Sequence, residues 1–94
     1  MSSASSEPAV ARARATLPEG VDLHARPAAD FVRTAMRFPG PVWVGSGERE
    51  VDAKSLLSIL ALGAKGGTEL VLRAEGDDAV AAVAALADCV AGLR

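Results

Sequence analysis

Residues 41–53 read Pro-Val-Trp-Val-Gly-Ser-Gly-Glu-Arg-Glu-Val-Asp-Ala, and this stretch decides the fold class. Two short runs, Pro41 to Gly45 and Arg49 to Ala53, flank the glycine-rich turn Gly45-Ser46-Gly47-Glu48. Two strand-like runs around such a turn predict a β-hairpin. Because the two strands of a hairpin are antiparallel, a wholly parallel sheet is excluded for this chain.

The segments near both ends of the chain supply two more strands. Residues 10–17 and 68–75 alternate polar and apolar side chains, with the period of two that is typical of a strand with one solvent-facing side. We expect the charged side chains that face solvent to be Arg12, Arg14, Glu69 and Arg73.

Three further segments have helical spacing. Residues 25–37 place apolar side chains at i, i+3, i+4, i+7 and i+8, which are Ala28, Phe31, Val32, Ala35 and Met36. Residues 54–63 predict a short helix closed by Gly63. Residues 78–93 predict a last helix, with an apolar stripe formed by Val80, Val83, Ala87 and Val90.

The predicted order of elements is βαββαβα, which belongs to the α+β class. The compact solution is one mainly antiparallel sheet with the helices packed on a single face. A length of 94 residues fits one small domain. We expect residues 1–8, which are rich in Ser and Ala, to be a disordered N-terminal extension, and residues 9–94 to form the domain.

Composition excludes several classes of function. Ten basic and twelve acidic residues give a formal charge of −2, which argues against a nucleic-acid-binding protein. The sequence has neither a signal peptide nor an apolar run long enough to insert into a membrane. The single Cys89 cannot form an internal disulfide, which indicates a reducing compartment such as the cytoplasm. One histidine and one cysteine exclude the ordinary zinc sites, so we expect no metal and no other cofactor.

His24 directly precedes the first predicted helix, in Leu23-His24-Ala25-Arg26-Pro27-Ala28-Ala29. It therefore takes the N-cap position, where Ser, Thr, Asp and Asn are preferred. The first turn of a helix has N–H groups without intrahelical partners and a partial positive charge. The N–H groups of Ala25 and Arg26, with the Arg26 guanidinium, can hold an anion there, such as a phosphoryl group on the imidazole. These residues alone leave open an ordinary surface histidine beside a turn.

The segment from Leu23 to Ala29 resembles the active-site motif of HPr, the phosphocarrier of the bacterial phosphotransferase system. A second block, Lys54 to Gly63, resembles the second-helix motif of the same family, with Ser55 after a basic residue. The resemblance covers about residues 9–93. It implies an open-faced β-sandwich, in which four antiparallel strands carry three helices on one face.

The resemblance also implies a function. In this family, enzyme I transfers a phosphoryl group from phosphoenolpyruvate to Nδ1 of the motif histidine, and the carrier passes it to enzyme IIA of a sugar permease. His24 matches the phosphorylated histidine, and Arg26 matches the active-site arginine. We therefore expect a monomeric, cytoplasmic phosphoryl carrier rather than a turnover enzyme. The alternative is a regulatory HPr paralogue, of the nitrogen-branch or dihydroxyacetone-kinase type, that acts by docking on protein partners.

The predicted helix 54–63 has two apolar arcs, which cannot both face one core. We assign Ile59 and Leu62 to the core, and we expect an exposed patch for partners, formed by Leu56, Leu57 and Leu60. By resemblance, this patch and the His24 region meet enzyme I and enzyme IIA. Ser55 is an N-cap residue. In many low-GC Gram-positive relatives the matching serine is phosphorylated by a dedicated kinase, which makes Ser55 a candidate regulatory site. The Ala- and Arg-rich composition argues against this modification, because it indicates a high-GC source, in which such a kinase is often absent.

One residue departs from the family pattern. Asp22 precedes Leu23-His24, where the family has glycine. That glycine permits a positive φ, which Asp adopts less readily. The charge of Asp22 is also expected to repel an incoming phosphate. The loop Glu19-Gly20-Val21-Asp22 is also slightly longer than in the family. The alternative is that this longer loop is built around Asp22, with its carboxylate bonded to its own backbone.

Overall fold

The structure is a computed structural model that describes residues 9–94, so the expected extension at residues 1–8 lies outside the described residues. The helices and strands follow the predicted βαββαβα order. They are β1 (Val10–Thr16), α1 (Ala25–Ala35), β2 (Val42–Ser46), β3 (Arg49–Asp52), α2 (Leu56–Leu62), β4 (Glu69–Glu75) and α3 (Ala79–Ala91). Within residues 9–94, no helix is long and apolar enough to cross a membrane.

The four strands form one sheet in the order β1-β4-β2-β3, and every neighbouring pair is antiparallel. The predicted hairpin is formed by β2 and β3, with Val44 opposite Val51. The last strand in the sequence, β4, lies between β1 and β2. The α+β class and the antiparallel sheet are therefore confirmed.

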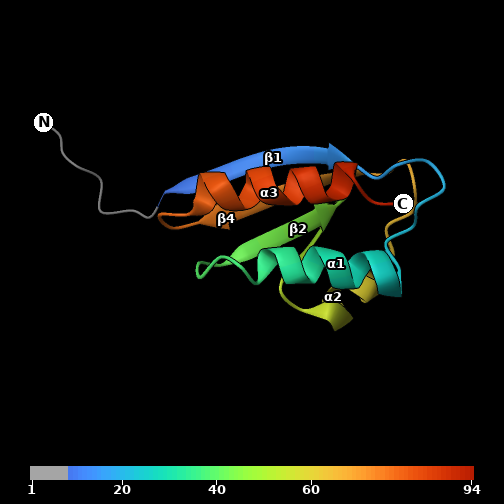
Figure 1. The fold of residues 1–94 in the computed structure, drawn as a ribbon, viewed down its shortest axis with the longest axis horizontal. Coiled ribbons are helices and arrows are strands. Elements are labelled where there is room, and N and C mark those ends of the chain that lie inside the picture. Colours follow the sequence, from blue (N-terminus) through green and yellow to red (C-terminus); the bar gives the residue numbers. More distant parts are fainter. Residues whose placement is uncertain (1–8) are drawn as a thin grey trace, which may run out of the picture.

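The helices cover one face of this sheet (Figure 1). α3 packs on β1 and β4, α1 lies beside α3, and α2 packs against α1 and β3. The start of α1 and the C-terminus of the chain lie at the same end of the molecule (Figure 1). Among residues 9–94, no helix covers the other face of the sheet.

The core between sheet and helices is mainly aliphatic. Among the described residues, Phe31 from α1 is the one aromatic residue that is fully buried there. The largest other members of the core, all fully buried, are Leu17, Ile59, Leu70, Leu72, Leu86, Val42, Val44 and Val90. Burial of each such side chain contributes about 1.5–3 kcal/mol relative to its exposure to water.

Two helix faces differ from the predicted ones. Val80 was expected in the apolar stripe of the last helix, but its exposed fraction is 73%. The buried stripe of α3 runs instead through Ala79, Ala82, Val83, Leu86 and Val90. Because α3 is rich in Ala and Val on all sides, its sequence offers little contrast by which to choose a face. Met36, also expected inside, is 62% exposed because α1 ends at Ala35 and Met36 is its C-cap.

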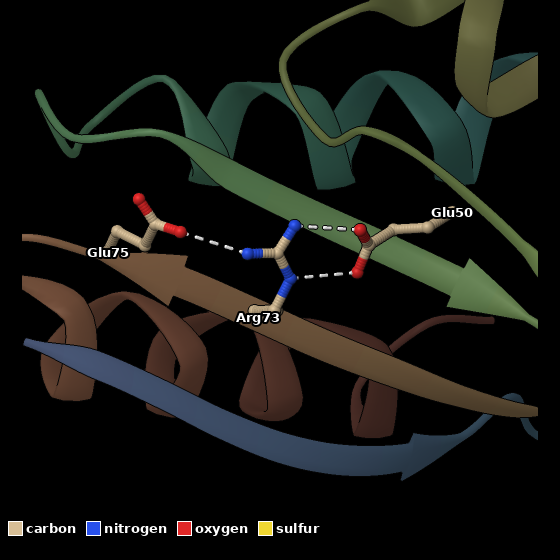
Figure 2. Close-up of polar contacts among 3 residues, drawn as sticks. All are labelled: Glu50, Arg73 and Glu75. Atoms are coloured by element: carbon tan, nitrogen blue, oxygen red, sulfur yellow. Dashed lines mark hydrogen bonds and ion pairs between the residues drawn. The ribbon is translucent and has the colours of Figure 1, made fainter.

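The open face of the sheet carries a cluster of charged side chains around Arg73 (Figure 2). Nε and Nη2 of Arg73 donate to the carboxylate of Glu50 at 3.0 and 2.8 Å, and Nη1 donates to Glu75 at 3.0 Å. The guanidinium also lies 3.8 Å from the centroid of the Trp43 ring. Arg73 does face the open side, as expected, but these contacts leave its side chain only 21% exposed. The hydrogen bond from Arg73 is the main cause that lowers the pKa of Glu50.

Candidate functional site

His24 lies at the N-cap of α1, and its side chain is exposed. Its backbone is extended, with φ −102° and ψ −168°. Its carbonyl oxygen accepts the first helical hydrogen bond, from the N–H of Ala28, at 2.8 Å. The imidazole forms no capping hydrogen bond to the helix, so the ring is not used to close the helix end. An exposed imidazole without a capping role is available to a partner molecule.

The first turn of α1 offers positive potential beside His24. It holds no acidic residue, and Pro27 contributes no N–H group. The N–H groups of Ala25 and Arg26 are at positions that have no intrahelical acceptor. An anion attached to the imidazole therefore meets backbone donors and the positive end of the helix dipole.

His24 also lines a shallow hollow of about 160 Å³. The walls come from the loop before α1 and from the end of α2 with the loop after it: Asp22, Leu23, His24, Leu60, Gly63, Ala64 and Lys65. The structure thus brings His24 together with Leu60, one of the three leucines of the predicted docking patch. The exposed Arg26 side chain instead lines a second hollow, formed with Asp30 and the chain end at Gly92, Leu93 and Arg94.

Backbone contacts join the two loops beside His24. The N–H of Leu23 donates to the carbonyl of Ala64 at 2.8 Å, and the N–H of Gly66 donates to Oδ1 of Asp22 at 2.9 Å. A Cβ added at Gly66 would lie 2.7 Å from the nitrogen of Gly20 and 2.8 Å from that of Val21. Gly66 is therefore required by this close approach.

Asp22 does not adopt the positive φ that the family's glycine permits. Within the described residues no residue other than glycine has a positive φ, and in this loop Gly20 carries it, with φ +79°. Because the longer loop places its glycine two residues earlier, Asp22 stays unstrained. Its carboxylate bonds the backbone of Gly66, 44 residues away, rather than backbone within its own loop.

The second block of the sequence motif forms α2. Ser55 is its N-cap, and its hydroxyl oxygen accepts from the N–H of Ser58 at 3.2 Å. Gly63 closes the helix with φ +64°, a conformation for which glycine is preferred. The exposed fractions follow the expected arcs: 40%, 80% and 36% for Leu56, Leu57 and Leu60, against full burial of Ile59. A docking role for the exposed arc, and modification of Ser55, stay predictions.

Sequence reasoning missed two residues of this site, Lys65 and Gly66. Neither residue stands out in the sequence by itself. The available signal was the pair of departures before His24, the longer loop and Asp22, because a changed loop needs a changed neighbour. No local pattern identifies that neighbour, since it lies more than 40 residues further along the chain.

Comparisons with known proteins agree with this geometry. A family model described as "PTS HPr component phosphorylation site" matches residues 11–92. The phosphocarrier protein HPr of Streptomyces coelicolor is 46% identical over 70 residues, which cover 73% of this chain and 75% of that protein. The HPr-like protein Crh of Bacillus subtilis is 42% identical over 65 residues, with 69% and 76% covered. The crystal structure of HPr from Bacillus anthracis superposes with a TM-score of 0.82 at 35% identity, and covers 87% of this chain and 98% of that one.

Proposed function

This chain belongs to the HPr family of phosphocarrier proteins of the phosphotransferase system, and from this premise we propose that His24 accepts a phosphoryl group from phospho-enzyme I and passes it to enzyme IIA of a sugar permease. The observation that carries the proposal is the exposed imidazole of His24 at the N-terminus of α1. The ring can be reached by two large partners in turn, and the helix end beside it suits an anion.

The transfer needs few groups from this chain. The lone pair of Nδ1 attacks phosphorus, and the bond between phosphorus and the donor atom of enzyme I breaks with its electron pair left on that atom. The imidazole keeps its proton on Nε2. In the onward step, an acceptor atom of enzyme IIA attacks phosphorus, and the bond from phosphorus to Nδ1 breaks with its electron pair left on Nδ1. This restores the neutral ring. The N–H groups of Ala25 and Arg26 and the Arg26 guanidinium balance the charge of the phosphoryl group.

A shallow site suits a relay. Every increment of free energy that stabilises phospho-His24 is added to the barrier for the onward step. An exposed helix end holds the group weakly, and the high energy of the phosphoimidazole drives the transfer. The chain therefore acts as a substrate of two enzymes rather than as a turnover catalyst, and we assign it to the cytoplasm as a monomer.

Partner docking is the second requirement of a relay. The exposed arc of Leu56, Leu57 and Leu60 on α2 adjoins the hollow that contains His24, since Leu60 lines both. A partner seated on this arc covers His24 at the same time. We propose this patch as the surface that enzyme I and enzyme IIA share.

The direct test is incubation with phosphoenolpyruvate and enzyme I, followed by intact-mass measurement. We expect one acid-labile phosphate on the parent chain and none on His24→Ala. Because His24 is exposed, the variant should keep its free energy of unfolding to within about 0.5 kcal/mol. A phosphate on the folded His24→Ala variant would assign the acceptor to another residue.

The likeness to the HPr-like protein Crh supports a second candidate, a regulatory paralogue that docks on proteins without feeding sugar uptake. The histidine at position 24 favours the carrier, because a module that only docks has no use for an acceptor ring. Transfer from the phosphorylated chain to enzyme IIA separates the two. Phosphorylation by enzyme I without onward transfer to any enzyme IIA would favour the regulatory candidate.

A further inference from the structure

The hollow that contains His24 holds one pair of opposite charges. Nζ of Lys65 lies 3.8 Å from Oδ2 of Asp22, and both residues line the hollow with His24. Arg26, the cation assigned by resemblance, lines the other hollow. Of these two cations, Lys65 is therefore the one that lines the His24 hollow.

The two members of this pair are held very differently. Oδ1 of Asp22 accepts the N–H of Gly66 at 2.9 Å, so the carboxylate cannot swing away without loss of that hydrogen bond. The side chain of Lys65 is 78% exposed, and its contact with Asp22 is longer than a hydrogen bond. Exposed ion pairs of this kind are weak. Asp22 is thus the fixed charge and Lys65 the mobile one.

A phosphoryl group on His24 changes this balance. It brings roughly two negative charges and three acceptor oxygens into a hollow where one carboxylate is already fixed. A dianion attracts the ammonium group more strongly than a single carboxylate does. We propose that Lys65 is a phosphate-binding residue, which Asp22 positions beside His24 in the free protein and which moves from Asp22 to the phosphoryl group when His24 is phosphorylated. The inference rests on the proposed function of His24.

Asp22 then has a defined part in the exchange. In the free protein it keeps the ammonium group of Lys65 at the hollow. In the phosphorylated protein its charge remains in place and repels the phosphoryl group, which keeps that group labile for the onward step. Lys65 compensates this repulsion.

The test separates phosphate binding by Lys65 from mere neutralisation of Asp22. The measured quantity is the equilibrium constant for phosphoryl exchange with enzyme I, in the parent, Lys65→Gln, Asp22→Asn and the double variant. Asparagine keeps an oxygen that accepts the N–H of Gly66 but carries no charge. We expect Lys65→Gln to lower the constant by about three- to ten-fold, both in the parent and in the Asp22→Asn background. If the effect disappears in the Asp22→Asn background, Lys65 only balances Asp22, and the proposal is overturned.

The chain offers a matched control in Arg14 and Glu69. This ion pair has the same 3.8 Å separation and similar exposure, 72% and 56%, but it lies on the sheet. Arg14→Gln removes the same charge and should leave the constant unchanged. An equal loss in Arg14→Gln would attribute the effect to net charge and would also overturn the proposal. Lys65→Arg should restore most of the affinity for the phosphoryl group.

A second arm does not depend on enzyme I. Phosphoramidate phosphorylates exposed histidine chemically, and ³¹P NMR then follows the titration of the phosphoryl group. If Lys65 binds that group, Lys65→Gln raises its pKa also in the Asp22→Asn background, because a nearby cation favours the dianion. An unchanged titration overturns the inference about Lys65. Failure of enzyme I to phosphorylate the parent would reject the proposed function, and this arm would still decide the role of Lys65.

Discussion

The residues around His24 that we propose to act on the phosphoryl group are exposed. Their substitution can therefore change phosphoryl transfer with little effect on the free energy of unfolding. His24, Arg26 and Lys65 all have side chains at the surface. Substitutions of such residues change the free energy of unfolding by only about 0.5 kcal/mol. An effect on phosphoryl exchange at these positions can therefore be interpreted as chemistry at the site.

Arg26 provides the sharpest prediction at this scale. We expect Arg26→Ala to accept phosphate from enzyme I but to transfer it about ten-fold more slowly, because one charged donor to the moving group is lost. Rapid-quench rates with enzyme I and with enzyme IIA measure both directions. Unchanged rates in both directions would show that Arg26, which lines the second hollow, stays away from the phosphoryl group.

At the scale of elements, α2 has apolar residues on both its buried side and its exposed side. Leu57 is 80% exposed and Ile59 is fully buried, although only two positions separate them. The helix packs its buried side against α1 and β3 and leaves the leucine arc to solvent. The exposed arc adds nothing to the core of the chain itself, which is why we assign it to partners.

This division can be tested with one variant on each side of α2. Leu57→Asp should weaken binding to enzyme I at least ten-fold, while the free energy of unfolding changes by less than about 1 kcal/mol. Ile59→Ala should do the reverse, with a loss of about 2–5 kcal/mol in stability and little change in binding by the folded fraction. Calorimetric titration and urea unfolding measure the two quantities. Unfolding of Leu57→Asp would show that the leucine is part of the core.

At the scale of the whole molecule, contacts between distant segments hold the site together. Gly66 approaches the backbone before His24 so closely that an added Cβ would lie 2.7 Å from the nitrogen of Gly20. We expect Gly66→Ala to lose about 1–3 kcal/mol of stability and to slow phosphorylation, since the loop must shift. Gly92→Ala is the control, because its nearest contact is an ordinary 3.5 Å. Equal stability of the two variants in urea would contradict this account.

The Arg73 cluster links two strands of the sheet across a third. Arg73 on β4 bonds Glu50 on β3, with β2 between them. The pKa of Glu50 is lowered in the folded chain, mainly by the hydrogen bond from Arg73. A group with a lowered pKa stabilises the fold above its unfolded pKa, and this contribution is lost as the pH falls through the folded value.

Near neutral pH, the free energy of unfolding should therefore be larger for the parent chain than for Glu50→Gln. This difference should become smaller once the pH falls below 4.5, the ordinary pKa of the carboxyl group. Urea unfolding of both chains from about pH 7 to about pH 3 measures it. A difference that stays constant or grows toward acid would mean that the carboxylate of Glu50 adds nothing to the fold.

The order of elements and the position of His24 follow from local sequence patterns. Strand and helix periods, the turn at residues 45–48 and the motif around His24 are local features, set by neighbours within a few positions. The same holds for the two arcs of α2, because hydrophobic residues at helical spacing define them without reference to the rest of the chain.

Tertiary contacts set which strands pair, which face of α3 is buried, and which residues surround His24. β4 lies between β1 and β2, an order that no local pattern contains. The uniformly apolar α3 takes its orientation from the sheet on which it packs. Lys65 lines the His24 hollow beside Asp22, which accepts a hydrogen bond from Gly66 across 44 positions of sequence. Such contacts depend on how the whole chain closes on itself, and therefore only the folded molecule reveals them.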